Sequence, residues 1–322
     1  MTVRYRDGIE FDLSDGTRVV CDADHPEGDV TVVSHAHGDH WPEGETTAVC
    51  STLTADLASA RRETPLHRTT DERIELLPAG HVAGSRAALV TDPDGTRYLY
   101  TGDVCTRSRL FLDGFEPPDA DVLVVESTYG EPGFVFPDHA TVEREILAWL
   151  RETDAPVILL GYALGRAQKL QLLAEKANRE RIFTTDAVQR VNDPIEAHLD
   201  IEFPAEDYTD EVELTAGGAL VLPMTTGRLD WLDRLAAETG AVKAGFSGWA
   251  VESSFKFRGD YDVTFPLSDH CDFEELLALV EQVDPERVYT THGSVDTLAS
   301  ELTSRGYDAT ALRQNQTTLG SF

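Results

Sequence analysis

Three histidines and one aspartate lie within six residues near the start of the chain: His35, His37, Asp39 and His40. Imidazole nitrogen and carboxylate oxygen are ligands that bind zinc at about 2.0–2.2 Å. The apolar run 30–33 just before them predicts a buried strand, and a strand that ends in a tight loop holds such side chains in a small volume. Four ligands are too many for one tetrahedral ion that keeps a position open for water, so the spacing predicts two adjacent metal ions. The alternative is a histidine-rich surface loop.

Two further candidate ligands follow other predicted strands. His81 comes after the strand predicted at 74–78, and the glycines around it allow the backbone to approach a site closely. Asp103 follows Gly102 at the end of a hairpin built around Asp94-Gly95. A carboxylate in that position is suited to bridge two cations.

Two acids at strand ends need partners if they are buried. Asp22 follows the strand 18–21, and we expect it to support a metal-ligating imidazole, in preference to Asp24, because it is closer to the apolar run. A solvated turn carboxylate is the alternative. Glu126 ends the apolar strand 121–125, where burial is costly without a cationic or proton-sharing partner.

Between residues 131 and 265 strands and helices alternate, which predicts a separate α/β lobe. The helical patterns cover 139–152, 165–178 and 227–239, and apolar strands are predicted at 157–160 and 219–222. The glycine-rich loop 161–166 opens a helix but is weak evidence for a phosphate cradle. In Phe255-Lys256-Phe257-Arg258, aromatic and cationic residues alternate, and we favour an amphipathic strand there over a nucleic-acid contact.

The last segment again contains candidate site residues next to predicted helices and strands, and this divides the chain into three parts. Ser268-Asp269-His270 precedes a helix predicted at 273–283, and a strand at 287–291 ends in His292 before a final helix at 295–305. We therefore predict a first domain part at 1–130, an inserted lobe at 131–265 and a return segment at 266–322.

The composition is strongly acidic. The 322 residues include 58 Asp and Glu against 27 Lys and Arg, a net charge of −31, and the acids are spread along the chain. Such a charge normally repels nucleic acid. In a high-salt cytoplasm the Debye length shrinks to about 3 Å at 1 M, so we interpret the chain as halophilic and the charge as serving solubility.

The sequence favours a cytoplasmic location. The four cysteines are scattered without a C-x-x-C pair, which predicts no disulfide framework and fits a reducing compartment. The N-terminus lacks the apolar core of a signal peptide, and no apolar stretch approaches the ~20 residues that cross a bilayer.

The order of the candidate ligands resembles the metallo-β-lactamase superfamily. The pattern is His35-x-His37-x-Asp39-His40, then His81, then Asp103. The resemblance implies an α/β fold, an αββα sandwich with a two-metal site along one sheet edge. Glu126, the segment 163–168 and the elements around His270 and His292 are similar to the β-CASP branch, whose enzymes cut phosphodiester bonds in RNA or DNA.

Within that branch, ligase-associated DNA exonucleases and archaeal mRNA 3′-end processing factors are the most similar. The inserted lobe would be a reduced β-CASP lobe of about 135 residues (131–265), and no appended RNA-binding domain is found. Both departures argue against a sequence-specific RNA endonuclease.

The resemblance also implies a role for each site residue. His35, His37 and His81 would hold a first ion, Asp39, His40 and His292 a second, and Asp103 would bridge two Zn²⁺ ions, with manganese or iron as alternatives. His270 would be the general acid, held by Glu126, because a carboxylate partner keeps an imidazole protonated near neutral pH. Arg166 and Ser268 would contact the substrate, and for Arg166 a structural salt bridge is the alternative.

The leading hypothesis is a metal-dependent exonuclease that processes the ends of DNA or RNA. Its partners would be single strands or strand ends, together with a DNA ligase, a helicase or RNA-processing proteins, and no membrane. A small-molecule hydrolase that cleaves a thioester or lactam would share the metal ligands, but it gives no role to the lobe or to the Glu126–His270 pair. An inactive nucleic-acid-binding scaffold would be expected to lose ligands, whereas every expected ligand type is present.

Overall fold

The computed structural model describes residues 2–62 and 64–314, and the chain divides into two compact units. The first unit consists of Met1–Gly133 and His270–Phe322, and the second of Phe134–Asp269. The chain thus enters and leaves the second unit three and four residues later than the sequence suggested, at 134 and 270 in place of 131 and 266. The return is later because Asp269 is anchored within the second unit by ion pairs with Arg166 and Lys169.

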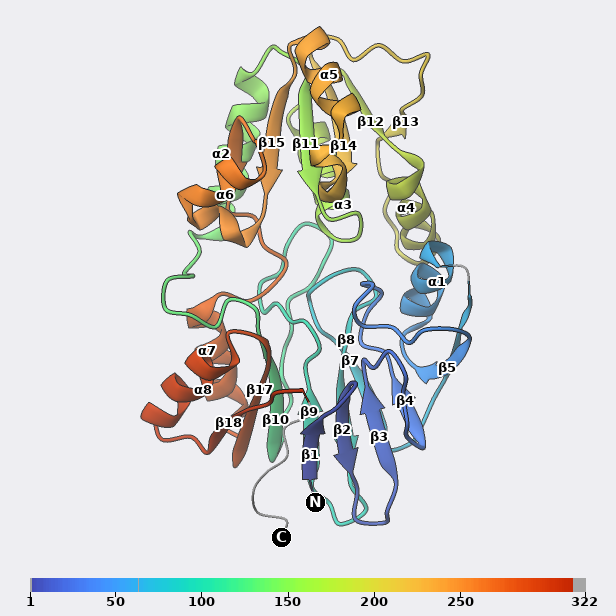
Figure 1. Cartoon of the computed structure of the whole chain (residues 1–322), viewed down its shortest axis with the longest axis vertical. Helices are drawn as coiled ribbons and strands as arrows, with labels where there is room; N and C mark the ends of the chain where they lie inside the picture. Colours follow the sequence, from blue (N-terminus) through green and yellow to red (C-terminus); the bar gives the residue numbers. More distant parts are fainter. Residues whose placement is uncertain (1, 63, 315–322) are drawn as a thin grey trace. The chain divides into compact units, whose positions relative to one another are not determined.

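The first unit contains two six-stranded sheets (Figure 1). Strands of the first sheet follow the chain in order, with antiparallel pairing up to β3 and parallel pairing from β3 to β6. They are β1 (Thr2–Tyr5), β2 (Ile9–Asp12), β3 (Arg18–Cys21), β4 (Val30–Val32), β5 (Thr46–Val49) and β6 (Leu66–Thr69). Between β5 and β6, helix α1 (Thr52–Arg61) begins at Ser51, whose side chain accepts a hydrogen bond from the Thr54 N–H.

The second sheet has the order β18-β17-β10-β9-β8-β7. Its members are β7 (Ile74–Pro78), β8 (Arg86–Thr91), β9 (Arg97–Tyr100), β10 (Val122–Ser127), β17 (Arg287–Gly293) and β18 (Ala309–Ala311). The central strand β10 pairs in parallel with β9 and β17, and its nearly continuous apolar run is typical of a strand covered on both faces. Because the three strands run in parallel, the residues that end them meet at one edge of the sheet.

Two hydrophobic cores give the first unit its layers. One core lies between the sheets and includes Phe11, Val32, Tyr100 and Val124. The other joins the second sheet to α7 (Phe273–Val283) and α8 (Val295–Ser304). The predicted αββα sandwich is confirmed (Figure 1).

The second unit is built on one parallel sheet of order β13-β12-β14-β11-β15-β16. Strands β11 (Val157–Gly161) and β14 (Gly218–Pro223) are buried along their whole length, as expected for a sheet with helices on both faces. The other strands are β12 (Arg181–Thr184), β13 (Glu206–Asp207), β15 (Val242–Phe246) and β16 (Val263–Phe265). The helices are α2 (His139–Glu152), α3 (Arg166–Lys176), α4 (Asp186–His198), α5 (Asp230–Thr239) and α6 (Ser253–Arg258), with 3₁₀ turns η1 (Met224–Arg228) and η2 (Gly248–Val251).

The predicted strand at Phe255–Arg258 was wrong. These residues form the end of α6, in which Phe255 is buried and Phe257 is 80% exposed. Four residues are too few to distinguish a period of two from a helical turn, and the preceding serines belong to the same helix.

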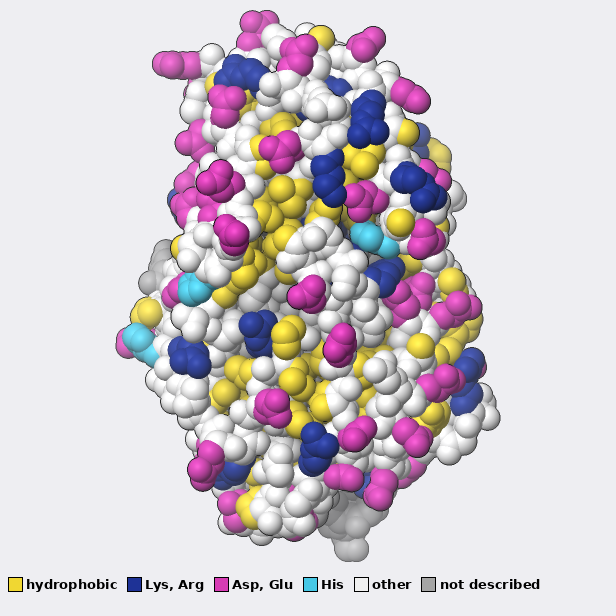
Figure 2. All heavy atoms as spheres, turned by 180° about the vertical axis from the view of Figure 1, so that it is seen from behind, with side chains coloured by type: hydrophobic (Ala, Val, Ile, Leu, Met, Phe, Trp, Pro, Cys, Tyr) yellow, Lys and Arg dark blue, Asp and Glu magenta, His cyan; other side chains and the backbone are white. Residues whose placement is uncertain are grey.

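The surface carries acidic side chains throughout. Figure 2 shows Asp and Glu distributed over the whole visible face, with fewer Lys and Arg among them. Within the described residues, the helices are all too short or too polar to traverse a bilayer.

Candidate metal centre

The candidate ligands come from loops and strand ends of the first unit. His35, His37 and His40 follow β4, His81 follows β7, and Asp103 follows β9. Glu126 lies near the end of β10, His292 near the end of β17, and His270 just before α7.

The first group converges on the Asp103 carboxylate. His35 Nε2 and His81 Nε2 each lie 3.4 Å from Asp103 Oδ2, and His37 Nδ1 lies 3.0 Å from His35 Nε2 and 3.2 Å from His81 Nε2. Ligand atoms of a tetrahedral zinc ion, at about 2.0–2.1 Å from the metal, are about 3.3 Å apart. Nitrogens and a carboxylate oxygen packed at this spacing therefore fit one zinc-sized cation.

The second group is built around His40. His40 Nε2 lies 3.7 Å from Asp103 Oδ2, so the same carboxylate oxygen faces both groups. The Asp39 carboxylate, 83% exposed, has Oδ2 3.9 Å from His40 Nε2, and the His292 ring centroid lies 5.4 Å from that of His40. Asp39 and His292 thus lie at the margin of the cluster and leave the second group more open than the first.

Asp22 supports the second group from beneath. Its Oδ2 contacts His40 Nδ1 at 2.9 Å and accepts a hydrogen bond from the Tyr100 hydroxyl at 2.8 Å, while its Oδ1 accepts one from the Ser34 N–H at 2.7 Å. Asp22 has φ +50°, in the left-handed region that Asp adopts more readily than most side chains other than Gly and Asn. The network holds Asp22 in this uncommon conformation, which aims its carboxylate at His40.

The electrostatics of the buried groups favour cation binding. Burial lowers the pKa of His35, His81 and His292, so these imidazoles are neutral near pH 7 with a lone pair available for a metal. For Asp103, burial acts to raise the pKa, but the charges of His40 and nearby imidazoles hold it well below its ordinary value. For His40, burial acts to lower the pKa, but the carboxylates of Asp103 and Asp22 raise it to about 10. A bound cation would displace that proton.

Beside this cluster, the buried Glu126 pairs with His270, which is partly exposed. Glu126 Oε1 lies 2.8 Å from His270 Nδ1 and accepts a hydrogen bond from the Val104 N–H at 2.8 Å, and its Oε2 accepts from the Thr128 hydroxyl. The His270 ring centroid lies 4.4 Å from that of His81. The carboxylate thus fixes the imidazole orientation and has the proton-sharing partner expected for a buried acid.

The segment after Asp103 anchors His270 from a second direction. Arg107 Nη2 donates to the His270 carbonyl at 2.7 Å, and Arg107 Nε lies 3.1 Å from Glu275 in the first turn of α7. The Cys271 N–H donates to the Val104 carbonyl at 2.8 Å. These contacts hold His270 against the segment that begins with Asp103.

Comparisons with known proteins agree with this arrangement. Residues 263–312 match the family model described as the Zn-dependent metallo-hydrolase RNA specificity domain. A protein named Probable DNA ligase from Opitutus terrae is 32% identical over 305 residues, which cover 89% of this chain and 29% of that protein. An RNase J-like protein from Methanocaldococcus jannaschii is 28% identical over 202 residues, 51% of this chain and 48% of that protein. The chain belongs to the metallo-β-lactamase/β-CASP family.

A solved structure supports the fold of this β-CASP protein. A protein of unknown function from Enterococcus faecalis superposes with a TM-score of 0.65 over 98% of both chains, at 13% sequence identity. The chain spans less than half the length of the two curated relatives described above, so the whole-length activities of those proteins do not transfer directly.

Arg166 and Ser268, expected to contact substrate, both lie in the second unit of the β-CASP protein and are buried. Arg166 Nε lies 3.1 Å from Asp269, its Nη1 donates to the Phe246 carbonyl at 3.2 Å, and its guanidinium lies 4.4 Å from the Tyr162 ring centroid. These contacts are those of the structural salt bridge that we named as the alternative. A substrate contact for either residue stays a prediction.

Tyr100, Ser34 and Arg107 support the site but were not predicted. Tyr100 reaches Asp22 from the second sheet across the core, and no pattern within one strand indicates such a contact. Ser34 stands directly before the histidine loop and contacts both Asp22 and His35 Nδ1, so its position was a usable signal.

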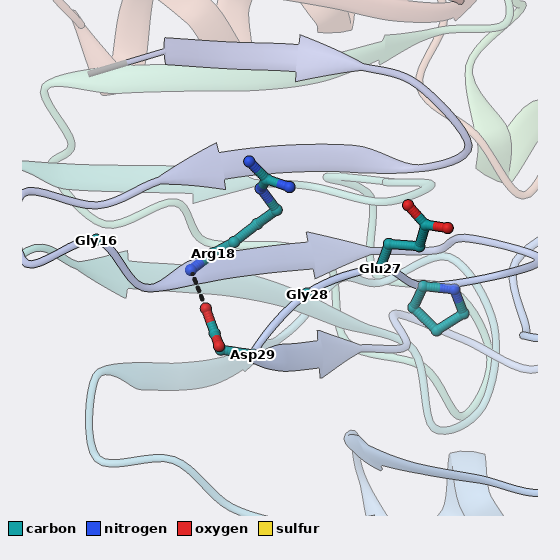
Figure 3. A pocket seen from close by; sticks show the side chains of 6 residues that line it. Gly16, Arg18, Glu27, Gly28 and Asp29 are labelled. Carbon is teal, nitrogen blue, oxygen red and sulfur yellow. Dashed lines mark hydrogen bonds between the residues drawn. The ribbon is translucent and has the colours of Figure 1, made fainter.

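A separate hollow of about 400 Å³ in the first unit carries none of the predicted site residues (Figure 3). It is lined by Gly16, Arg18, Pro26, Glu27, Gly28 and Asp29. The Arg18 backbone N–H donates to the Asp29 carboxylate at 2.8 Å, and the lining contains no histidine or cysteine.

Proposed function

We propose that this protein is a two-metal nuclease that hydrolyses phosphodiester bonds, as an exonuclease at the ends of DNA or RNA strands. The observation that carries the proposal is the Glu126–His270 pair, with 2.8 Å between Oε1 and Nδ1, beside a cluster of four histidines and Asp103. A metal cluster alone suits many hydrolases, whereas a histidine held by its own carboxylate supplies the proton that an alkoxide leaving group requires.

The cluster would hold two zinc ions, with manganese or iron as alternatives. His35, His37 and His81 would bind one ion and Asp39, His40 and His292 the other, with Asp103 shared, because Asp103 Oδ2 lies within 3.7 Å of His35, His40 and His81. Such ions neutralise the charge of the scissile phosphate and make water nucleophilic near neutral pH. Asp22 would keep the His40 ring in its ligating orientation through the contact at Nδ1.

The chain's own acid would complete the reaction. Glu126 holds His270 at Nδ1, so the proton for the leaving oxygen would come from Nε2. The Glu126 charge favours the protonated imidazole before the step, and the same carboxylate orients the neutral ring after it. Arg107 would keep the ring in place through the His270 carbonyl.

Both DNA and RNA have support as substrates, and we place DNA first. The match to the protein named Probable DNA ligase covers 89% of this chain, so an end-processing role beside a ligase or helicase is the best supported. The match to the RNA specificity domain and to the RNase J-like protein favours RNA-processing partners as the second candidate. The four cysteines are buried free thiols, and a cytoplasmic location stays our prediction.

A cleavage assay on end-labelled single-stranded DNA and RNA of matched sequence tests the proposal. Zinc or manganese would be supplied in molar KCl, with EDTA as control. Metal-dependent shortening from one end, faster on DNA, is the expected result. Protein that binds two metals but cuts neither strand would instead favour the small-molecule hydrolase, and protein that binds strands without binding metal would favour the inactive scaffold.

A further inference from the structure

The large hydrophobic side chains that are exposed within the described residues all belong to the second unit. They are Val135, Tyr162, Leu229, Trp249 and Phe257, of which Phe257 is 80% exposed. Isolated exposed apolar residues are ordinary, but their restriction to one unit points to a function. Three of the five are aromatic.

Most of these side chains follow the carboxyl ends of parallel strands. Tyr162 comes directly after β11, Leu229 follows β14 and η1, and Trp249 and Phe257 lie in η2 and α6, which follow β15. Strands β14, β11 and β15 are adjacent and parallel, so the segments that follow them emerge at the same edge of the sheet. In open parallel sheets this edge is where ligands bind, above all where neighbouring strands connect in opposite directions. Strands β11 and β14 are such neighbours, since β11 leads to β12 on one side and β14 leads to β15 on the other.

Contacts tie these segments into one surface. The Arg228 guanidinium, at the end of η1, donates to the Arg258 carbonyl of α6 at 3.1 Å. Arg228 and Arg166 both lie close enough to Tyr261 to act on its phenol. Burial raises the pKa of that phenol, and the positive charges of the two arginines oppose the rise. We call the exposed side chains Tyr162, Arg228, Trp249, Lys256, Phe257 and Arg258 the aromatic edge.

Cationic side chains lie among the aromatic residues of the aromatic edge, and the exposed acids Asp230, Glu252, Asp260 and Asp262 lie in the same segments. Lys256 and Arg258 flank Phe257 on α6, and Lys256 is one of only four lysines in the chain. Arg258 is partly offset by Glu252, 3.4 Å away, while no ion pair is found for Lys256 in the part of the chain that the structure describes. Aromatic faces with interspersed cations suit stacked bases and their phosphates.

We propose that the aromatic edge is a stacking platform for single-stranded nucleic acid, with Phe257 and Trp249 as the principal base contacts. A duplex hides its base faces, so the platform selects single strands. Stacking depends little on ionic strength, whereas phosphate contacts weaken steeply with salt. A chain with a net charge of −31 can therefore hold an anionic polymer through the faces of its bases.

This inference deepens the proposed function by naming single strands as the substrate form, but binding is measured separately from cleavage. The 322-residue chain in EDTA, which prevents cutting, would be titrated against a fluorescein-labelled 15-mer of DNA or RNA, single-stranded or duplex. Fluorescence anisotropy would be read in 0.2 M and 2 M KCl. The variants are Phe257→Ala, Trp249→Ala and, as matched control, Phe257→Leu, which keeps apolar surface but has no aromatic face.

We expect each Ala variant, and Phe257→Leu as well, to weaken single-strand binding about 10-fold, with wild-type affinity falling less than 10-fold between the two salt concentrations. Duplex binding should be weaker than single-strand binding in the wild type. Unfolding midpoints equal to that of the wild type would show that these exposed substitutions leave the fold intact.

Three results would overturn the platform. Unchanged affinity in both Ala variants removes its two main residues. Full retention in Phe257→Leu indicates a merely apolar contact, as a protein partner would make. If the wild type does not bind single strands, the surface is assigned to a protein partner instead. If the wild type cuts strands but the variants bind them as tightly as the wild type does, the platform is rejected and the proposed nuclease is kept. If binding depends on the aromatic residues but no strand is cut, the platform is kept and the nuclease is rejected.

Discussion

At the scale of single residues, the centre depends on one carboxylate oxygen. Asp103 Oδ2 lies within 3.7 Å of nitrogens from His35, His40 and His81, three side chains that come from two separate loops. A group in that position holds imidazoles together even before a cation binds, and its negative charge is the reason that a cation is favoured there.

The first prediction concerns metal content. Asp103→Asn removes the charge while keeping the shape, so the variant should bind fewer than half of the metal ions that the wild type binds, measured by elemental analysis after dialysis against zinc. Asp24→Asn, a change at a nearby exposed acid, should bind as the wild type does. Two ions retained by Asp103→Asn would exclude Asp103 as a bridging ligand.

The second prediction concerns the metal-free protein and pH. The pKa of His40 is about 10 in the folded chain against an ordinary value of 6.5, so the stability it contributes is present below pH 6.5 and lost as pH rises through 10. The pKa values of His35, His81 and His292 are lowered in the folded chain, which has the opposite effect. As the pH drops below 6.5, these imidazoles bind protons more readily in the unfolded chain than in the folded chain, so the stability of the folded chain falls. Urea unfolding in EDTA should therefore show greatest stability near neutral pH.

Two variants isolate the alkaline side of this profile. His40→Gln should remove the loss of stability between pH 7 and 10, whereas His25→Gln, at an exposed position, should leave it unchanged. An alkaline loss of equal size in His40→Gln would show that another group causes it.

At the scale of elements, the loops approach so closely that one glycine is required. Gly102, the residue directly before Asp103, has φ +55°, and a Cβ atom on it would lie 2.6 Å from the Ser34 side chain. The end of β9 and the histidine loop can meet only because this residue has no side chain.

The third prediction compares two glycines. Gly16 also has a positive φ, +89°, but a Cβ there meets no atom within 4 Å. Gly16→Ala should cost about 1 kcal/mol of unfolding free energy from backbone strain alone, and Gly102→Ala more than about 2 kcal/mol together with weaker zinc binding. Urea unfolding and zinc titration measure the two effects, and equal costs would show that the approach to Ser34 is not tight.

The elements that could be predicted from the sequence were those with strong local signals. Helix α2 and strand β7 have the predicted bounds, and α7 begins at Asp272 with a reciprocal capping box that its local sequence indicates. Helix α4 was not predicted because Pro194 lies inside it. The contact of Tyr100 with Asp22 was missed because it depends on how two sheets pack, and α6 was assigned wrongly because its pattern is short.

At the scale of the whole molecule, the main feature is the large negative net charge. The excess of acids over bases is 58 − 27 = 31, and the acids are distributed over the face that Figure 2 shows. Repulsion of this kind opposes the compact state and is relieved by screening. The same charge makes salt part of every binding experiment on this protein.

The fourth prediction is that potassium chloride stabilises the protein. The midpoint of thermal unfolding should rise by at least 10 °C between 0.1 M and 2 M KCl, because the Debye length falls from about 10 Å to below about 3 Å. An equal osmolality of sucrose serves as the control for excluded-solute effects. A midpoint that is unchanged or lower in KCl would contradict the halophilic interpretation.

The central claim is that His270, held by Glu126, protonates the leaving oxygen of a phosphodiester beside the metal cluster. The most direct test compares two oligonucleotides, one normal and one in which sulfur replaces the leaving oxygen, because a thiolate leaves without a proton. His270→Ala should cut the normal strand about 10²–10⁴-fold more slowly than the wild type, with metal content unchanged, yet cut the sulfur-containing strand at nearly the wild-type rate. Equal slowing on both strands, or no slowing on either, would contradict the account.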